Sequence, residues 1–318
     1  MLSTRLLPLL LFLLVLVPVQ AQTVLVAPVA RPVLPVPQPP SLRVRSYLLI
    51  EHDTGQVLAA HEPDLRVEPA SITKVLSAYV VFHELKAGRL QLDEQVRVSE
   101  NAWRSAIGGS RMFLAAGSRA RVEDLILGMI VQSGNDATIA LAEHIGGSEG
   151  GFVSMMNEYA RRLGMNASSF SNSTGLPDPN LYTTASDLAK LARAMIAEFP
   201  EYYPWYRVKS FTYNNIPQPN RNTLLQRDET VDGLKTGHTR SAGYCLISTA
   251  KRDDTRLIAV VMGSASERAR ADESQALLNF GFRNFEHHTI FTAGQLLREW
   301  PVYKGETDQV RLGVADAV

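Results

Sequence analysis

The strongest helical pattern of apolar positions in the chain begins just after Glu68-Pro69, a pair that is a helix-start signal. Apolar residues then recur at intervals typical of one face of a helix, at Ile72, Val75, Leu76, Tyr79 and Val80. Gly88 is a plausible stop. The pattern therefore predicts a helix between Pro69 and Gly88 with one face buried.

Strand-like runs lie on both sides of a block of helical ones. Alternation predicts a hairpin over 46–60, with its turn at residues 53–56. Helical periodicity follows over 122–131, 136–145, 149–163 and 186–199, and then strands over 233–236, 243–249 and 256–262 and a closing helix over 267–280. The two groups of strands can share one antiparallel sheet, with the helix after Pro69 packed on it and the helical block inserted.

The two ends of the chain have patterns of their own. Residues 1–21 combine Arg5, a short apolar core and a small-residue cleavage site, as a secretory signal peptide does; an uncleaved anchor is the alternative. Residues 22–42 are rich in proline and almost uncharged, which predicts an extended linker. We expect 43–283 to form one compact unit. Residues 284–318, strand-like over 289–291 and 298–303, are too few for a core and predict the beginning of an incomplete β-rich domain.

Composition excludes several classes of function. The chain has 32 basic and 32 acidic residues and no basic block, which argues against a nucleic-acid partner. Cys245 is the only cysteine, so an exported chain would have no internal disulfide and would depend on a sizeable core. No Cys/His cluster has metal-ligand spacing, and His287-His288 is a polar strand start, so no metal or cofactor is expected.

Ser71 and Lys74 bring candidate chemistry to the helix after Pro69. They lie three residues apart, on one face of its first turn. A serine hydroxyl becomes a nucleophile when an adjacent base removes its proton, and a neutral lysine can be that base. The helix end and burial both lower a lysine pKa. By itself Ser71 would more often be a plain helix N-cap than a nucleophile, and a second Ser-x-x-Lys at Ser248 runs off a strand into a turn, where we read it as structural.

Two further motifs fall where a site could form. Ser133-Gly134-Asn135 occupies the short gap between two predicted helices, where Gly134 would permit an unusual backbone and a cleft could receive the hydroxyl and amide groups. Ser99-Glu100-Asn101 has the same pattern, but we expect it to be a helix cap. Lys235-Thr236-Gly237 lies on a strand, where Gly237 would let a substrate backbone approach and the other two could hold a carboxylate. A surface strand with an incidental lysine is the alternative.

Together, Ser-x-x-Lys, Ser-x-Asn and Lys-Thr-Gly in this order form the motif set of penicillin-binding proteins and class A β-lactamases. Longer stretches, at 69–74, 132–137, 172–178, 232–239 and 280–283, resemble the low-molecular-mass penicillin-binding proteins, which are exported bacterial D-alanyl-D-alanine carboxypeptidases. The resemblance runs from about Ser46 to the end. It implies an α/β fold of the β-lactamase/transpeptidase type: an antiparallel sheet flanked by helices, an inserted all-helical subdomain with the active site between them, and a β-rich second domain.

The resemblance also implies a role for each motif residue. Ser71 would attack the carbonyl between two D-alanines, Lys74 would be its base, kept neutral by the helix end and by nearby Lys235, and Ser133 would relay a proton to the departing D-alanine. The backbone N–H groups of Ser71 and His238 would form the oxyanion hole. The substrate would be bound by Asn135, Lys235, Thr236, Gly237, His238 and Arg270, the last chosen over Arg268.

The implied substrates are peptidoglycan stem peptides ending in D-Ala-D-Ala, with β-lactams as inhibitors that acylate Ser71 and the periplasm as location. Longer family members carry a C-terminal amphipathic helix that holds them on the outer face of the inner membrane. This sequence lacks it, so membrane attachment stays open. A class A β-lactamase would need a glutamate near 168–172, where there is none. A D,D-endopeptidase of the same family and a catalytically silent wall-binding scaffold remain as alternatives.

Overall fold

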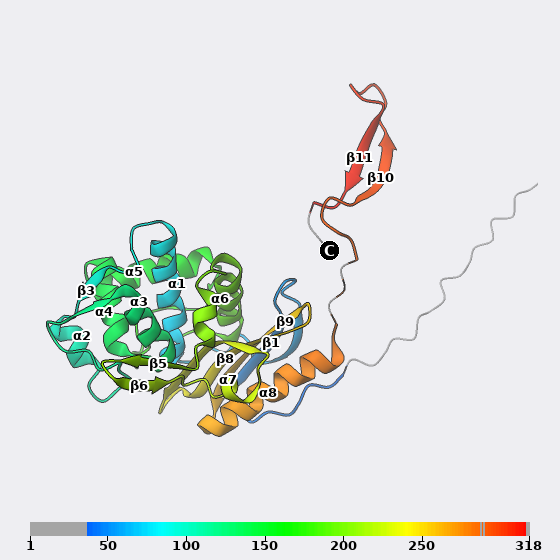
Figure 1. Ribbon diagram of the computed structural model, residues 1–318. Coiled ribbons are helices and arrows are strands. Elements are labelled where there is room, and N and C mark those ends of the chain that lie inside the picture. The colour runs from blue at the N-terminus through cyan, green and yellow to red at the C-terminus, as the bar shows by residue number, and fades with distance from the viewer. Residues whose placement is uncertain (1–36, 287, 289, 316–318) are drawn as a thin grey trace, which may run out of the picture. The chain divides into compact units, whose positions relative to one another are not determined.

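A computed structural model describes residues 37–286, 288 and 290–315 (Figure 1). The expected signal peptide, most of the expected linker, His287 and Thr289 lie outside these residues. The described part contains a five-stranded antiparallel sheet in the order β2-β1-β9-β8-β7. Its strands are β1 (Ser46–Glu51), β2 (Val57–His61), β7 (Val231–Thr239), β8 (Gly243–Arg252) and β9 (Thr255–Ser264).

The first strand joins the last ones, as expected. β1 pairs with β2 in the predicted hairpin and with β9 on its other side, where Leu49 faces Ala259. Alternate side chains of β1 therefore enter two different cores. Leu48 and Ile50 belong to the core shared with the helical block, and Tyr47 and Leu49 to the core on the opposite face, where α8 (Glu267–Asn284) packs on β8 and β9.

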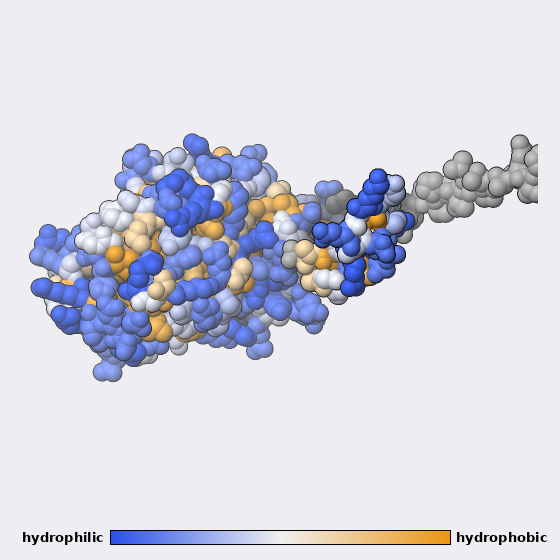
Figure 2. All heavy atoms as spheres, turned by 90° about the horizontal axis from the view of Figure 1, so that it is seen from above, coloured by the Kyte–Doolittle hydropathy of each residue, from blue (hydrophilic) through white to orange (hydrophobic). Residues whose placement is uncertain are grey.

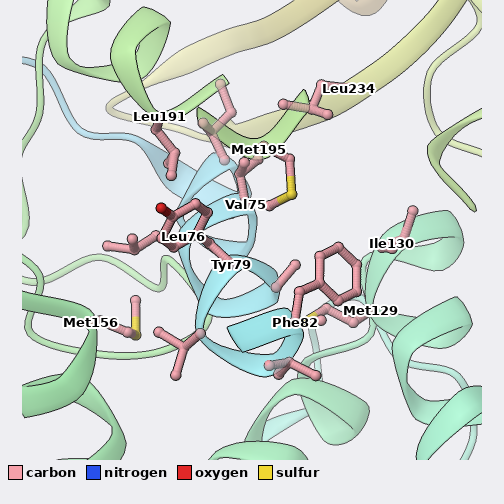
Figure 3. Packing of buried hydrophobic residues seen from close by; sticks show 14 of the residues in the cluster. Val75, Leu76, Tyr79, Phe82, Met129, Ile130, Met156, Leu191, Met195 and Leu234 are labelled. Atoms are coloured by element: carbon pink, nitrogen blue, oxygen red, sulfur yellow. The ribbon is translucent and has the colours of Figure 1, made fainter. Parts of the chain in front are cut away.

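The helix after Pro69 lies at the centre of the larger core. It begins as a single 3-10 turn, η1 (Ala70–Ile72), and continues as α1 (Thr73–Lys86). The prediction of one buried face was wrong, because all of α1 except His83 and Lys86 is buried. Figure 3 shows the cause: Val75, Leu76, Tyr79 and Phe82 are surrounded by side chains from the helical block and from β7. A helix enclosed on all sides has few polar positions, so periodicity cannot identify its faces.

The helical block contains the four predicted helices: α3 (Val122–Leu127), α4 (Asn135–Gly146), α5 (Glu149–Arg162) and α6 (Ala185–Glu198). The last three lie within one residue of their expected bounds, whereas α3 ends four residues before the predicted 131. The first of the four ends in a π-helical turn, η2 (Gly128–Gln132). α2 (Glu100–Ser105) begins after the helix cap expected at Ser99. Other small elements were not predicted: β3 (Gln95–Arg97), β4 (Arg119–Arg121), η3 (Tyr203–Arg207), β5 (Ser210–Tyr213), β6 (Ile216–Pro219) and α7 (Leu224–Arg227).

A separate two-stranded sheet lies near the end of the chain. β10 (Leu296–Pro301) pairs with β11 (Gln309–Gly313), and every residue of both strands is exposed. Ile290 and Phe291 lie in a bend, so the strand predicted over 289–291 does not form in its described part. Among the described residues, no helix is both long enough and apolar enough to span a membrane. Figure 2 shows a mainly hydrophilic surface in which apolar atoms are scattered.

Candidate active site

Ser71 and Lys74 meet at the junction of η1 and α1. Lys74 is 1% exposed. Its Nζ lies 3.1 Å from Ser71 Oγ, 2.8 Å from Asn135 Oδ1 and 2.7 Å from the Thr174 carbonyl oxygen. The amide and carbonyl oxygens can only accept hydrogen bonds. A neutral amine therefore donates its two hydrogens to these oxygens, which leaves its lone pair to accept the hydroxyl hydrogen of Ser71.

The charge state of Lys74 suits this arrangement. Burial lowers the pKa of Lys74 to about 7, while the nearby carboxylates of Asp136 and Glu149 act in the opposite direction. From the sequence, the helix end, Lys235 and burial are all expected to lower the pKa of Lys74. In the structure, desolvation by burial is the main cause of the lowered pKa. An amine with this pKa is partly neutral at neutral pH, as a general base must be.

The turn that carries Ser133 and Asn135 differs from the prediction in its backbone. Ser133, not Gly134, takes the left-handed conformation, with a φ of 65°. Gly134 is needed for close packing instead, since a Cβ there would lie 2.8 Å from Asp136 Oδ1 and 3.1 Å from the Met112 nitrogen. The turn directs Asn135 to Lys74 and leaves the buried Ser133 Oγ without a hydrogen-bond partner among the described residues.

Asp136 holds a neighbouring segment over this turn. Its two carboxylate oxygens accept hydrogen bonds from the backbone N–H groups of Met112 and Leu114, at 2.9 and 3.1 Å. The Asn135 N–H donates to the Ser110 carbonyl at 2.8 Å. A buried carboxylate that accepts two backbone N–H groups is satisfied, so residues 110–114 form a fixed rim beside the nucleophile.

The strand motif lies against the nucleophile turn. Gly237 is next to η1, where a Cβ would come within 2.8 Å of the Pro69 carbonyl oxygen and 3.2 Å of Ala70 Cβ. The glycine therefore lets η1 approach β7, whereas the sequence argument assigned that space to a substrate. Lys235 is buried, and burial together with the charges of Lys74, Arg270 and Arg221 lowers its pKa.

Two neighbouring cavities flank Ser71 and share several lining residues. The larger, of about 420 Å³, extends along Asn135, Thr174, Gly175 and Leu176. The smaller, of about 260 Å³, is lined by Ser133, Thr236, Gly237, Tyr244, Glu267 and Arg270. Ser71, His238 and Arg221 border both cavities. The arrangement provides room for one group on each side of the nucleophile, with cationic and hydroxyl groups on the smaller side.

The structure distinguishes the two candidate arginines. The side chain of Arg270 is 5% exposed, and its guanidinium lies 5.8 Å from the ring of Tyr244, which stacks on His238. Its Nε has no hydrogen-bond partner among the described residues. The side chain of Arg268 is 87% exposed and pairs with Asp272 away from the nucleophile. Only Arg270 of this pair reaches the smaller cavity.

Several groups at the site have no signal in the sequence that gives their role. Thr174 supplies a carbonyl to Lys74 and lies in the 172–178 stretch, whose resemblance to the family implies no particular role for it. Arg221 enters from the loop after β6, where no sequence signal marks it. The two excluded motif copies are structural in the fold: Ser248 is buried within β8, and Ser99 caps α2 by accepting the Ala102 N–H.

Comparison with known proteins agrees with this geometry. A family model described as D-alanyl-D-alanine carboxypeptidase matches residues 35–266. D-alanyl-D-alanine carboxypeptidase DacA of Haemophilus influenzae is 43% identical over 278 residues, 86% of this chain and 71% of that protein. D-alanyl-D-alanine carboxypeptidase DacC of Escherichia coli is 42% identical over 283 residues, which are 87% of this chain and 71% of that protein. The crystal structure of penicillin binding protein 5 from Haemophilus influenzae superposes with a TM-score of 0.86 and 43% identity, covering 88% of this chain and 82% of that one. This chain belongs to the D-alanyl-D-alanine carboxypeptidase family.

Proposed function

We propose that this protein is a serine-type D-Ala-D-Ala carboxypeptidase, which removes the terminal D-alanine from peptidoglycan stem pentapeptides through an acyl-enzyme. The observation that carries the proposal is the environment of Lys74. Two acceptor oxygens and a pKa near 7 leave its lone pair directed at Ser71 Oγ. A serine with a buried neutral lysine at 3.1 Å is an activated nucleophile.

In the first half of the reaction, Ser71 Oγ attacks the carbonyl carbon between the two D-alanines while Lys74 takes its proton. The negative charge on the carbonyl oxygen is stabilised by the N–H groups of Ser71 and His238. Ser133, whose Oγ lies at the cavity wall without a hydrogen-bond partner among the described residues, gives its proton to the departing amine and takes the proton held by Lys74, which leaves Lys74 neutral again. The C–N bond breaks, D-alanine leaves and the peptide stays on Ser71 as an ester. Water then attacks this ester, with Lys74 again as base, and restores the serine.

The terminal carboxylate belongs in the smaller cavity. Thr236 offers a hydroxyl and Arg270 a positive charge at the cavity wall, and Lys235 is buried on the same strand as Thr236. In the empty site, burial and the neighbouring cations lower the pKa of Lys235. A bound carboxylate acts in the opposite sense, since an opposite charge favours the protonated amine. Substrate binding therefore favours the protonated form of Lys235. The part of the stem peptide upstream of the cleaved bond occupies the larger cavity, beside Asn135 and His238.

The same geometry supports β-lactams as inhibitors that acylate Ser71, since they carry a carboxylate next to a reactive amide carbonyl. We place the enzyme in the periplasm, with residues 1–21 as its signal peptide and 22–42 as a linker. We assign catalysis to 43–283, and 284–318 to the beginning of a β-rich domain.

Release of D-alanine from a pentapeptide ending in D-Ala-D-Ala tests the proposal, with wild type compared with Ser71→Ala. We expect release by wild type and none by the variant, because among the described residues Ser71 is the one whose hydroxyl is hydrogen-bonded to Lys74 Nζ. Labelled penicillin should attach to wild type alone. Labelling without D-alanine release would favour an endopeptidase that cuts cross-links. Neither labelling nor release would favour a wall-binding scaffold and contradict the proposal.

A further inference from the structure

Glu267 brings a negative charge to a cavity that otherwise presents cations. Glu267 is the single acidic residue among the described residues that line the smaller cavity, and Arg221 and Arg270 line the same cavity. Its Oε1 accepts a hydrogen bond from Arg270 Nη2 at 3.3 Å. The residue is the first of α8, whose start is fixed because Ser266 caps it by accepting the Ala269 N–H. The backbone therefore holds Glu267 at the edge of the cavity.

The two partners of this ion pair differ in freedom. The side chain of Arg270 is 5% exposed, whereas that of Glu267 is 56% exposed. The arginine is therefore held in place, while the glutamate can turn towards solvent when another anion arrives. The carboxylate that the proposed function places in this cavity needs the same guanidinium. A substrate carboxylate and Glu267 thus compete for Arg270, and like charges close together repel.

We propose that Glu267 is a specificity residue that sets the affinity of the smaller cavity for anionic groups. It serves as the counter-ion of Arg270 in the empty site and opposes the binding of a terminal carboxylate, and of any further negative charge on the leaving residue. The inference rests on the proposed function, which supplies the carboxylate. It assigns Glu267 a part in substrate selection and none in the bond-breaking steps.

Glu267→Gln tests this assignment, because glutamine keeps the size of the side chain and removes its charge. We expect the KM for a peptide ending in D-Ala-D-Ala to fall about two- to fivefold, the range for a partly exposed ion pair. The kcat should hardly change, since the carboxylate is bound equally in the ground and transition states. A peptide with a terminal amide in place of the carboxylate should show no gain.

The same helix offers a matched control. Asp272 lies one turn further along α8, is 55% exposed and pairs with Arg227 and Arg268 outside the smaller cavity. Asp272→Asn changes the charge of the protein equally, so we expect it to leave KM unchanged. Thermal unfolding of both variants would show whether either change disturbs the fold. The gain from Glu267→Gln should also shrink in an Arg270→Ala background, because coupled residues are not additive.

Acylation by penicillin provides a readout that does not depend on peptide hydrolysis. Glu267→Gln should raise the second-order acylation rate by the same two- to fivefold factor, again about the size of an exposed ion pair. A wild type that is acylated but releases no D-alanine would overturn the proposed function and still allow this comparison. Equal effects of Glu267→Gln and Asp272→Asn, or an equal gain on the amide peptide, would overturn the role of Glu267.

Discussion

At the scale of single residues, one buried amine determines the chemistry of this protein. Full burial drives the pKa of Lys74 down to about 7, and the carboxylates of Asp136 and Glu149 keep it from falling further. The Thr174 carbonyl and the Asn135 amide then orient the amine. Neither carbonyl nor amide changes charge with pH in the working range, so the orientation persists while the protonation state of Lys74 changes.

This balance predicts the pH dependence of acylation. Lys74 must be neutral to accept the Ser71 proton, and it is protonated below its folded-state pKa of about 7. The rate of penicillin acylation should therefore rise with pH through about 7 and level off above it. Stopped-flow acylation rates between acidic and mildly alkaline pH measure the curve. A rate that is flat through this window would show that Lys74 is not the base.

At the scale of elements, the site depends on how closely three segments approach one another. η1 carries the nucleophile, β7 passes along one side with Gly237, and the loop with Gly175 passes along another. Gly175 has a φ of 84°, and a Cβ there would lie 1.8 Å from the Ala70 carbonyl oxygen. Asn172 fixes this loop, since its Oδ1 accepts the N–H groups of Thr174, Gly175 and Leu176. Any side chain at 175 would push the nucleophile turn away.

Substitution of Gly175 by alanine should therefore lower the free energy of unfolding by more than the backbone strain alone would. Gly164→Ala is the matched control, because Gly164 also has a positive φ of 70° but has nothing within 4 Å of a Cβ. We expect the control to lose about 1–2 kcal/mol of unfolding free energy and to keep its acylation rate. Gly175→Ala should lose roughly 1–3 kcal/mol more and acylate far more slowly. Urea unfolding measures the loss of unfolding free energy in each variant, and penicillin labelling measures its acylation rate. Equal losses in Gly175→Ala and Gly164→Ala would contradict the packing explanation.

At the scale of the whole molecule, two cores on opposite faces of one sheet hold the site. The larger core encloses α1, and the smaller one joins the sheet to α8, whose end is packed through Phe280 and Phe285. Residues 288–315 contribute the β10–β11 sheet, in which every strand residue is exposed. The division of the chain after α8 remains our proposal.

Truncation after Glu286 tests this division. It keeps Phe285 and all five strands of the main sheet and removes β10 and β11. Because the removed strands hydrogen-bond to each other in a sheet of their own, we expect the melting temperature and the penicillin acylation rate to stay near those of the full chain. A markedly lower melting temperature, confirmed by circular dichroism, would mean that the C-terminal residues support the catalytic unit.

Much of the fold could be predicted because its signals are local. The hairpin at 46–60, four helices of the inserted block and the three later strands each have their own periodicity and caps. The strand predicted at 289–291 failed, since a short apolar run does not identify a strand without a pairing partner. The short β3 and β4 strands were missed because their few residues carry little periodicity, whereas the start of α2 could be predicted from its cap at Ser99. The enclosure of α1 was also missed, since it depends on neighbours from distant parts of the chain.

The sequence by itself determined which reactive groups the chain contains and the order of its motifs, because Ser71 and Lys74 are neighbours within a single helical turn. Only the tertiary structure decided the pKa of Lys74, the burial of Arg270 against the exposure of Arg268, and the entry of Arg221 and Glu267 into the cavity. The physical reason is that desolvation and electrostatic interactions depend on distances through space between segments far apart in the chain. The glycines at 134, 175 and 237 likewise owe their roles to backbone packing that no local pattern records.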